Sequence, residues 1–322
     1  MNIDQLTDKM KKLNKGMERF MPFLTPTGVI LGLILGRHIA HLKPAVTYLF
    51  MFLTFTGAIS ISIKDFGRTL KKPSFLAAYA ILSYLIMPLI AKLGAISVFP
   101  NSPDTVSGYV LLRSIPSAVT GTIWATIYSG NMAICLSILI LDTLIAPLMT
   151  PFLFSLYSGA TIKVDFIGML TSMFTMVVIP SIIGMIANQY KGGKINKHVG
   201  PCLKPISKIA LLFVLMINTA QVSDRIIANA SFSYITIALS SLGITILGFV
   251  TSYFVNKAMK FNREDSISIT FSVAMRNISA ALVLAIDYLP PAAALPCIFG
   301  IVFQQSICAI MGSILFKKKD AE

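Results

Sequence analysis

Four ionisable side chains lie well inside long apolar blocks of the sequence: Lys92, Arg113, Asp142 and Arg276. A charge at the centre of a bilayer costs at least ~2.5–3.5 kcal/mol, so a deep one should face protein or a water-filled cavity. Asp142 and Arg276 fall near the middle of their blocks, too deep to reach the interface. They predict a site for an anionic solute or an ion, with a permanent Arg276–Asp142 ion pair as the structural alternative.

The other two residues lie closer to the ends of their blocks. Lys92 is expected to extend its ammonium group to the membrane interface. Arg113 lies in the outer half of its block, shortly before Pro116. This position suits either contact with lipid headgroups or contact with the solute as it enters the site.

Polar and helix-breaking residues interrupt the two blocks that contain Arg113 and Arg276. Pro116 lacks a backbone donor and Gly121 lowers the cost of irregular geometry. Together with Asp142, the candidate substrate- or ion-binding residues are Ser117, Thr120, Thr122, Ser272, Arg276 and Asn277. Freed backbone groups are tolerated at this depth only in protein or beside a cavity. Matched interruptions therefore predict two broken helices that form one site, and an ordinary proline kink is the alternative.

The composition of the chain predicts that these residues lie in transmembrane helices. Hydrophobic residues make up 55% of the 322 positions and charged residues only 12%, against about a quarter charged in soluble domains. The stretch 231–256 has no charge and is long enough to cross a hydrocarbon core of about 30 Å. We predict an all-α membrane protein with about ten transmembrane helices, near 22–41, 44–63, 74–98, 106–129, 131–158, 165–189, 206–226, 231–256, 265–289 and 291–316.

Basic residues indicate the orientation of these helices. With ten spans, 20 of the 27 Lys and Arg residues fall on one side of the membrane and four on the other. The positive-inside rule then predicts a protein of the inner (plasma) membrane with both termini in the cytoplasm. Because the charges lie in short loops, the net charge of +14 needs no nucleic-acid partner; the lipid bilayer is the expected partner.

The chain is expected to fall into two inverted halves. Five spans in each half give opposite topologies, so residues 22–158 and 165–316 form two inverted five-helix repeats, with the fourth and ninth helices broken. Residues 1–21 carry an apolar stripe flanked by lysines, which predicts an amphipathic helix on the membrane surface. A loop over 190–205 and the basic tail 317–322 are expected in the cytoplasm.

These features favour a secondary transporter of a small organic solute. Protease and hydrolase motifs and the P-loop are absent from the sequence, which argues against an enzyme or an ATP-driven pump. The three histidines and four cysteines lack the spacing of a metal site, so we expect no metal centre or cofactor. Sodium or a proton is the expected coupling ion, and a membrane-embedded enzyme or a channel is the alternative of another class.

In these stretches the sequence resembles the bile acid:sodium symporter family. The resemblance rests on Pro116, Gly130-Asn131, Ala133, Pro147 and Thr150-Pro151, and on Ser272-Val-Ala-Met-Arg-Asn277 followed by Ala280-Ala281. It implies a panel of helices 1, 2, 6 and 7 and a core of helices 3–5 and 8–10, in which helices 4 and 9 cross at the substrate and ion sites. It also implies transport of organic anions together with sodium.

The chain departs from this family at the positions of its sodium ligands. Ser272 stands where the family has a glutamate, and Arg276 where it has a glutamine. The other replaced positions are Ser83, Gly121-Thr122, Cys135 and Leu139. Since sodium prefers hard oxygen ligands, we predict transport of a small organic anion that does not require sodium. The alternative is a proton-coupled organic-acid exporter of the auxin-efflux-carrier type.

The predicted topology can be tested by labelling a cysteine placed in the longest basic loop. Lys194→Cys should resist an impermeant thiol reagent applied to intact cells, because 20 basic residues place this loop in the cytoplasm. Permeabilised cells provide the positive control. Modification of intact cells would overturn the ten-span topology.

Overall fold

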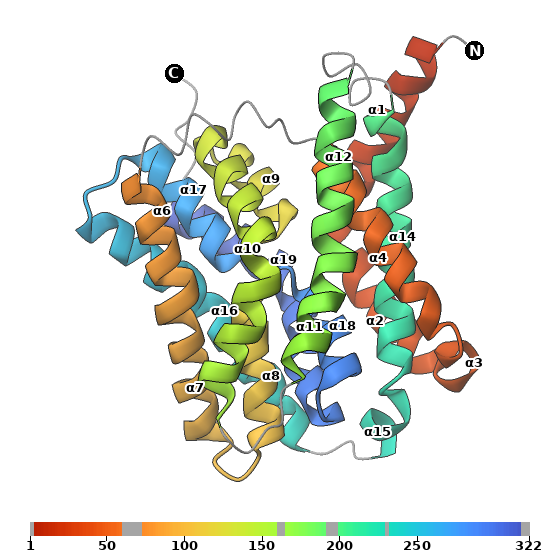
Figure 1. Ribbon diagram of the computed structural model, residues 1–322, viewed down its shortest axis with the longest axis vertical. Helices are drawn as coiled ribbons and strands as arrows, with labels where there is room; N and C mark the ends of the chain where they lie inside the picture. The colour runs from red at the N-terminus through yellow and green to blue at the C-terminus, as the bar shows by residue number, and fades with distance from the viewer. Residues whose placement is uncertain (1–2, 60–72, 160–164, 191–198, 229–231, 317–322) are drawn as a thin grey trace. The chain divides into compact units, whose positions relative to one another are not determined.

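The computed structural model describes residues 3–59, 73–159, 165–190, 199–228 and 232–316 (Figure 1). The chain forms two compact units, each made of two separate stretches of sequence. Unit 1 comprises residues 1–64 and 171–230, and unit 2 comprises residues 65–170 and 231–322. This division agrees with the panel and core implied by the resemblance, since unit 1 contains the segments of helices 1, 2, 6 and 7.

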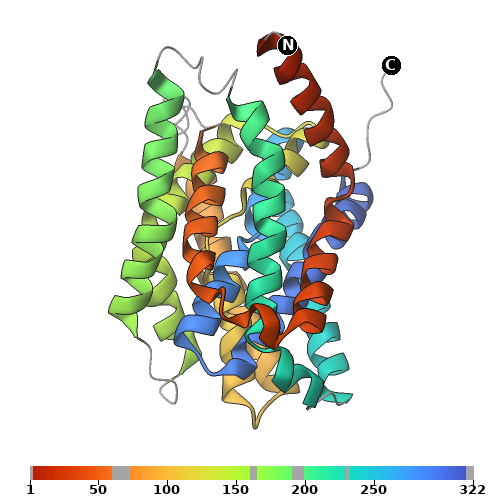
Figure 2. The same cartoon turned by 90° about the vertical axis from the view of Figure 1, so that its right-hand side faces the viewer.

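Unit 1 contains the helices α1 (Ile3–Arg19), α2 (Met21–Leu35), α3 (Arg37–Ala40), α4 (Lys43–Ala58), η2 (Phe174–Val178), α12 (Ile179–Gln189), α14 (Gly200–Ala220) and α15 (Ser223–Ala228). Figure 2 shows four of them side by side, in the order α12 (green), α4 (orange), α14 (teal) and α2 (red). The predicted amphipathic helix forms as α1 and packs against α14, and its location on the membrane surface stays a prediction.

Unit 2 contains α6 (Pro73–Ala80), η1 (Ile81–Ile86), α7 (Met87–Val98), α8 (Pro103–Ser114), α9 (Val119–Ile127), α10 (Met132–Ser158), α16 (Phe232–Ala258), α17 (Arg263–Ala274), α18 (Ile278–Tyr288), η4 (Pro291–Ala293) and α19 (Ala294–Leu315). The helix α11 (Phe166–Met173) joins the two units. Within unit 2, α10 packs against both α8 and α17, and α19 packs against α8, α16 and α18. The two interrupted helices, α8–α9 and α17–α18, are therefore surrounded by continuous ones.

Six helices in the described part of the chain are long and apolar enough to cross a membrane: Ser74–Val98, Met132–Ser158, Phe166–Gln189, Gly200–Ala220, Ser233–Ala258 and Pro291–Leu315. The protein is therefore an all-helical, multi-pass membrane protein. The other four expected spans correspond to shorter or interrupted helices, so the count of ten and the inverted repeats remain predictions.

Several predicted boundaries change. The helix expected over 22–41 is interrupted at Gly36, whose φ of +39° favours glycine. The loop expected over 190–205 is shorter, because α14 already begins at Gly200. Residues 191–198 of that loop, the end of the helix expected over 44–63, and the tail 317–322 lie outside the described residues.

Close packing of α2 on α14 depends on Gly32. A Cβ atom at Gly32 would meet the carbonyl oxygen of Met216 at a distance too short for any real contact. We expect Gly32→Ala to lower the free energy of unfolding in detergent by about 1–3 kcal/mol, the usual cost of overpacking. Gly94→Ala is the control, because nothing lies within 4 Å of a Cβ at that exposed helical position. Equal melting temperatures for the two variants would contradict the packing seen here.

Candidate functional site

The two helix breaks of unit 2 meet and pair through their backbones. One break separates α8 from α9 and the other separates α17 from α18. Ala118 N–H donates to the Met275 carbonyl at 2.9 Å, and Asn277 N–H donates to the Pro116 carbonyl at 2.8 Å. Ser117 and Arg276 thereby face each other in a short antiparallel bridge. The pairing satisfies backbone groups that would otherwise be left without partners inside a membrane.

Side chains of neighbouring helices form hydrogen bonds with further backbone groups at the two breaks. Gln304 of α19 accepts from Arg276 N–H and donates to the Arg276 carbonyl, both at 3.0 Å. The Thr150 hydroxyl of α10 donates to the carbonyl of Ser114 at 3.0 Å. Asn277 caps α18 by accepting from Ala280 N–H. The crossing point is thus held by α10 and α19 as well as by the bridge itself.

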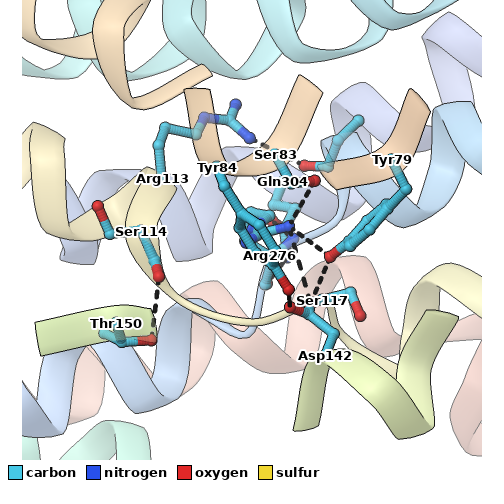
Figure 3. A network of polar contacts seen from close by, with 11 residues as sticks. Tyr79, Ser83, Tyr84, Arg113, Ser114, Ser117, Asp142, Thr150, Arg276 and Gln304 are labelled. Atoms are coloured by element: carbon cyan, nitrogen blue, oxygen red, sulfur yellow. Dashed lines mark hydrogen bonds and ion pairs between the residues drawn. The ribbon is translucent and has the colours of Figure 1, made fainter. Parts of the chain in front are cut away.

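Asp142 projects from α10 to this crossing point, with 2% of its side chain exposed (Figure 3). Its Oδ1 atom accepts from the Tyr84 hydroxyl at 2.6 Å. Its Oδ2 atom accepts from the Tyr79 hydroxyl and from Ser117 N–H. Three donors from three elements therefore face the carboxylate and bond to both of its oxygens.

Arg276 is the charged partner, with 1% of its side chain exposed. Its Nη1 atom lies 4.0 Å from Asp142 Oδ2 and donates to the Tyr79 hydroxyl at 3.0 Å and to Ser83 Oγ at 3.2 Å. Its Nε and Nη2 atoms are buried without a hydrogen-bond partner among the residues described, and so is Ser117 Oγ. The guanidinium thus has one occupied edge and one edge that still has donors to offer.

Of the two roles predicted for Arg113, the structure argues against contact with lipid headgroups, and contact with the entering solute stays a prediction. The Arg113 side chain is only 2% exposed, so it does not reach lipid headgroups. The guanidinium donates to the carbonyls of Ala274 at 3.1 Å and Ile244 at 2.6 Å. It fills the space above Gly248 on α16, where an added Cβ would lie 3.1 Å from it. Arg113 therefore fastens the end of α17 to α8 and α16.

The structure brings together Ser117, Asp142 and Arg276 from the predicted set, and Asn277 joins them through the backbone. Thr122 is buried but donates to the Val119 carbonyl of its own helix, and Thr120 is half-buried in the same helix. Ser272 is buried near Cys135. None of these last three forms a hydrogen bond to the Arg276–Asp142 pair within the described residues.

Sequence reasoning missed the partners of the two charges, Tyr79, Tyr84 and Gln304. Gln304 carries the only available signal, because a glutamine pair at 304–305 is unexpected in an apolar helix. The two tyrosines carry none, since tyrosine is common in membrane helices.

The chain resembles known transporters over most of its length. Residues 47–229, more than half of the chain, match the family described as the Sodium Bile acid symporter family. The "uncharacterized protein YbaS" of Bacillus subtilis is 34% identical over 92% of this chain and 96% of its own length. The chloroplastic "probable sodium/metabolite cotransporter BASS1" of Arabidopsis thaliana is 27% identical over 97% of this chain and 78% of its own. The "uncharacterized sodium-dependent transporter YocS" of Bacillus subtilis is 22% identical over 91% and 90%.

These relatives bear on the functional classes. The family and its named members are transporters, which agrees with the prediction that the chain is not an enzyme. The match gives no support to an auxin-efflux-type carrier, a membrane-embedded enzyme or a channel.

The contacts of Asp142 predict how the fold responds to loss of Arg276. Arg276→Gln should remain folded in detergent, because Asp142 keeps its three other donors. The loss of unfolding free energy should stay below the ~3–5 kcal/mol that breaking an isolated buried ion pair costs. Melting temperature and monodispersity on gel filtration measure this. A loss as large as that for a broken pair would identify a purely structural ion pair.

Proposed function

Because the chain belongs to the sodium bile acid symporter family, we propose that it is a secondary transporter of a small organic anion. It carries the anion unchanged across the inner (plasma) membrane by alternating access, with both termini in the cytoplasm. The binding site is the crossing point of the two helix breaks, where Arg276 attracts the anion and Asp142 balances the charge in the empty state.

One observation supports this assignment above the others. A fully buried arginine lies in the unwound part of a membrane helix and retains two donors without partners in the described residues. Unwound backbone and intramembrane charges mark solute pathways in secondary transporters. A permanent ion pair alone would need no break in either helix.

We also propose that transport does not require sodium, although the named relatives are described as sodium-dependent or as sodium cotransporters. The family resemblance assigns sodium ligands to the positions of Ser83 and Arg276. Here the guanidinium of Arg276 donates directly to the Ser83 hydroxyl at 3.2 Å, so a permanent positive charge lies where the family would bind sodium between these two positions' side chains. A guanidinium offers donors only and cannot coordinate a cation. Ser272 supplies no carboxylate where the family has one.

Uptake into proteoliposomes tests both statements. Radiolabelled monocarboxylates should accumulate unchanged, and Arg276→Gln should abolish uptake while the protein stays folded. Replacing sodium by potassium on both sides should leave the initial rate nearly unchanged, because Arg276 supplies the charge that sodium would bring. A steep, saturable dependence on sodium would show that backbone carbonyls suffice to bind it.

A further inference from the structure

We propose that the carboxylate of the solute binds the Nε–Nη2 edge of Arg276 and that Asp142 takes up one proton as it binds. Carboxylate and proton then cross the membrane together, one of each per cycle. The inference rests on the proposed function and assigns it a solute class, monocarboxylates, and a coupling ion.

The geometry of Arg276 assigns the binding edge. Its Nη1 atom is engaged by Tyr79 and Ser83 and lies beside Asp142. The remaining Nε–H and one Nη2–H point in the same direction from a planar group, which is the fork that binds both oxygens of a carboxylate. Both atoms are buried and have no partner among the described residues. The solute therefore binds the Nε–Nη2 edge while the Nη1 atom keeps its partners, and it does not need to displace Asp142.

A second buried polar group of the same bridge also lacks a hydrogen-bond partner among the described residues. Ser117 faces Arg276 across the bridge, and its buried hydroxyl has no partner in the described part of the chain. Buried donors without partners are rare in folded proteins and call for an explanation. A polar solute at this point would satisfy groups from both helix breaks at once.

Charge balance then requires a proton. In the empty site, the positive charge of Arg276 is matched by the carboxylate of Asp142. A bound carboxylate adds a negative charge to a site whose two charged groups are buried, and an unmatched buried charge is strongly unfavourable. Protonation of Asp142 restores neutrality: a hydronium ion gives up a proton, so that one of its O–H bonds breaks to leave water, and one O–H bond forms on the carboxylate.

The surroundings of Asp142 can hold this proton. The charged or titratable groups that face it are Tyr79 of α6, Tyr84 of η1 and Arg276. A tyrosine hydroxyl can accept as well as donate, so either one can turn to accept from a protonated Asp142. The other described helices that pack against α10 bring no further charged group to Asp142. On α8, the side chain of Arg113 bonds to two carbonyls. The helix α9 has no titratable side chain, and Lys92 is the one charged residue of α7. The acidic residues of α17 lie in its first turn.

Calorimetry on the purified full-length protein tests the inference, with acetate, pyruvate, 2-methylbutyrate and benzoate as probes. Titrations in buffers of different ionisation enthalpy should give one proton taken up per carboxylate bound. Because one proton is linked to binding, the affinity should fall as the pH rises, by up to about tenfold for each pH unit. Asp142→Asn should bind without proton uptake and with little pH dependence. Asp287→Asn, an exposed site in the last turn of α18, should behave like the unmodified protein.

Arg276→Lys separates the fork from the charge. Lysine keeps the positive charge but lacks two parallel donors, so carboxylate affinity should fall by about tenfold or more while the protein remains folded. Unchanged affinity in this variant would overturn the assigned edge. Binding and uptake of a carboxylate with no proton taken up would overturn the coupling and leave the anion transporter intact. Failure of the folded protein to bind any of the four probes would count against the organic-anion assignment itself.

Discussion

Broken helices inside a membrane need internal partners for every backbone group that leaves the helix ladder. In unit 2 the two breaks meet much of this need by pairing with each other, through Ala118 with Met275 and Asn277 with Pro116. Proline at 116 suits this arrangement, because its carbonyl accepts a bond and it has no N–H to satisfy. The crossing point is therefore fixed by hydrogen bonds, and each residue in it has a defined neighbour.

The same constraint fixes the two buried charges. Gln304 holds the N–H and the carbonyl of Arg276, so the side chain starts from a fixed point and reaches Ser83 and Tyr79. The backbone N–H of Ser117 holds Asp142 from the other break. Each charge is thus bonded to the unwound part of a helix. A shift of either break must change the surroundings of both charges, which connects binding to the conformation of the crossing helices.

Local signals in the sequence were sufficient to predict the breaks and the two charges. Pro116 and the polar run before Asn277 stand out in apolar blocks, and Asp142 and Arg276 are costly at their depth. The partners could not be predicted, because Tyr79 and Gln304 come from helices far apart in sequence and are ordinary in their own contexts. For a related reason, the sequence left Arg113 open between contact with lipid headgroups and contact with the entering solute: position along a helix gives depth, but not the neighbouring helix that covers the side chain.

The two buried arginines differ in what balances their charge. Arg113 donates through Nη1 to the carbonyl of Ala274 at the C-terminal end of α17, where the helix dipole is negative, and through Nη2 to the carbonyl of Ile244. Its Nε atom has no partner among the described residues. Arg276 precedes the N-terminal end of α18, where the dipole is positive, so its balance rests on Asp142. Backbone carbonyls cannot change their charge, whereas an aspartate can. In the proposed transport cycle, a bound anion is therefore compensated at Arg276 and not at Arg113, and the proposal makes Arg276 the position where the charge of the solute is sensed.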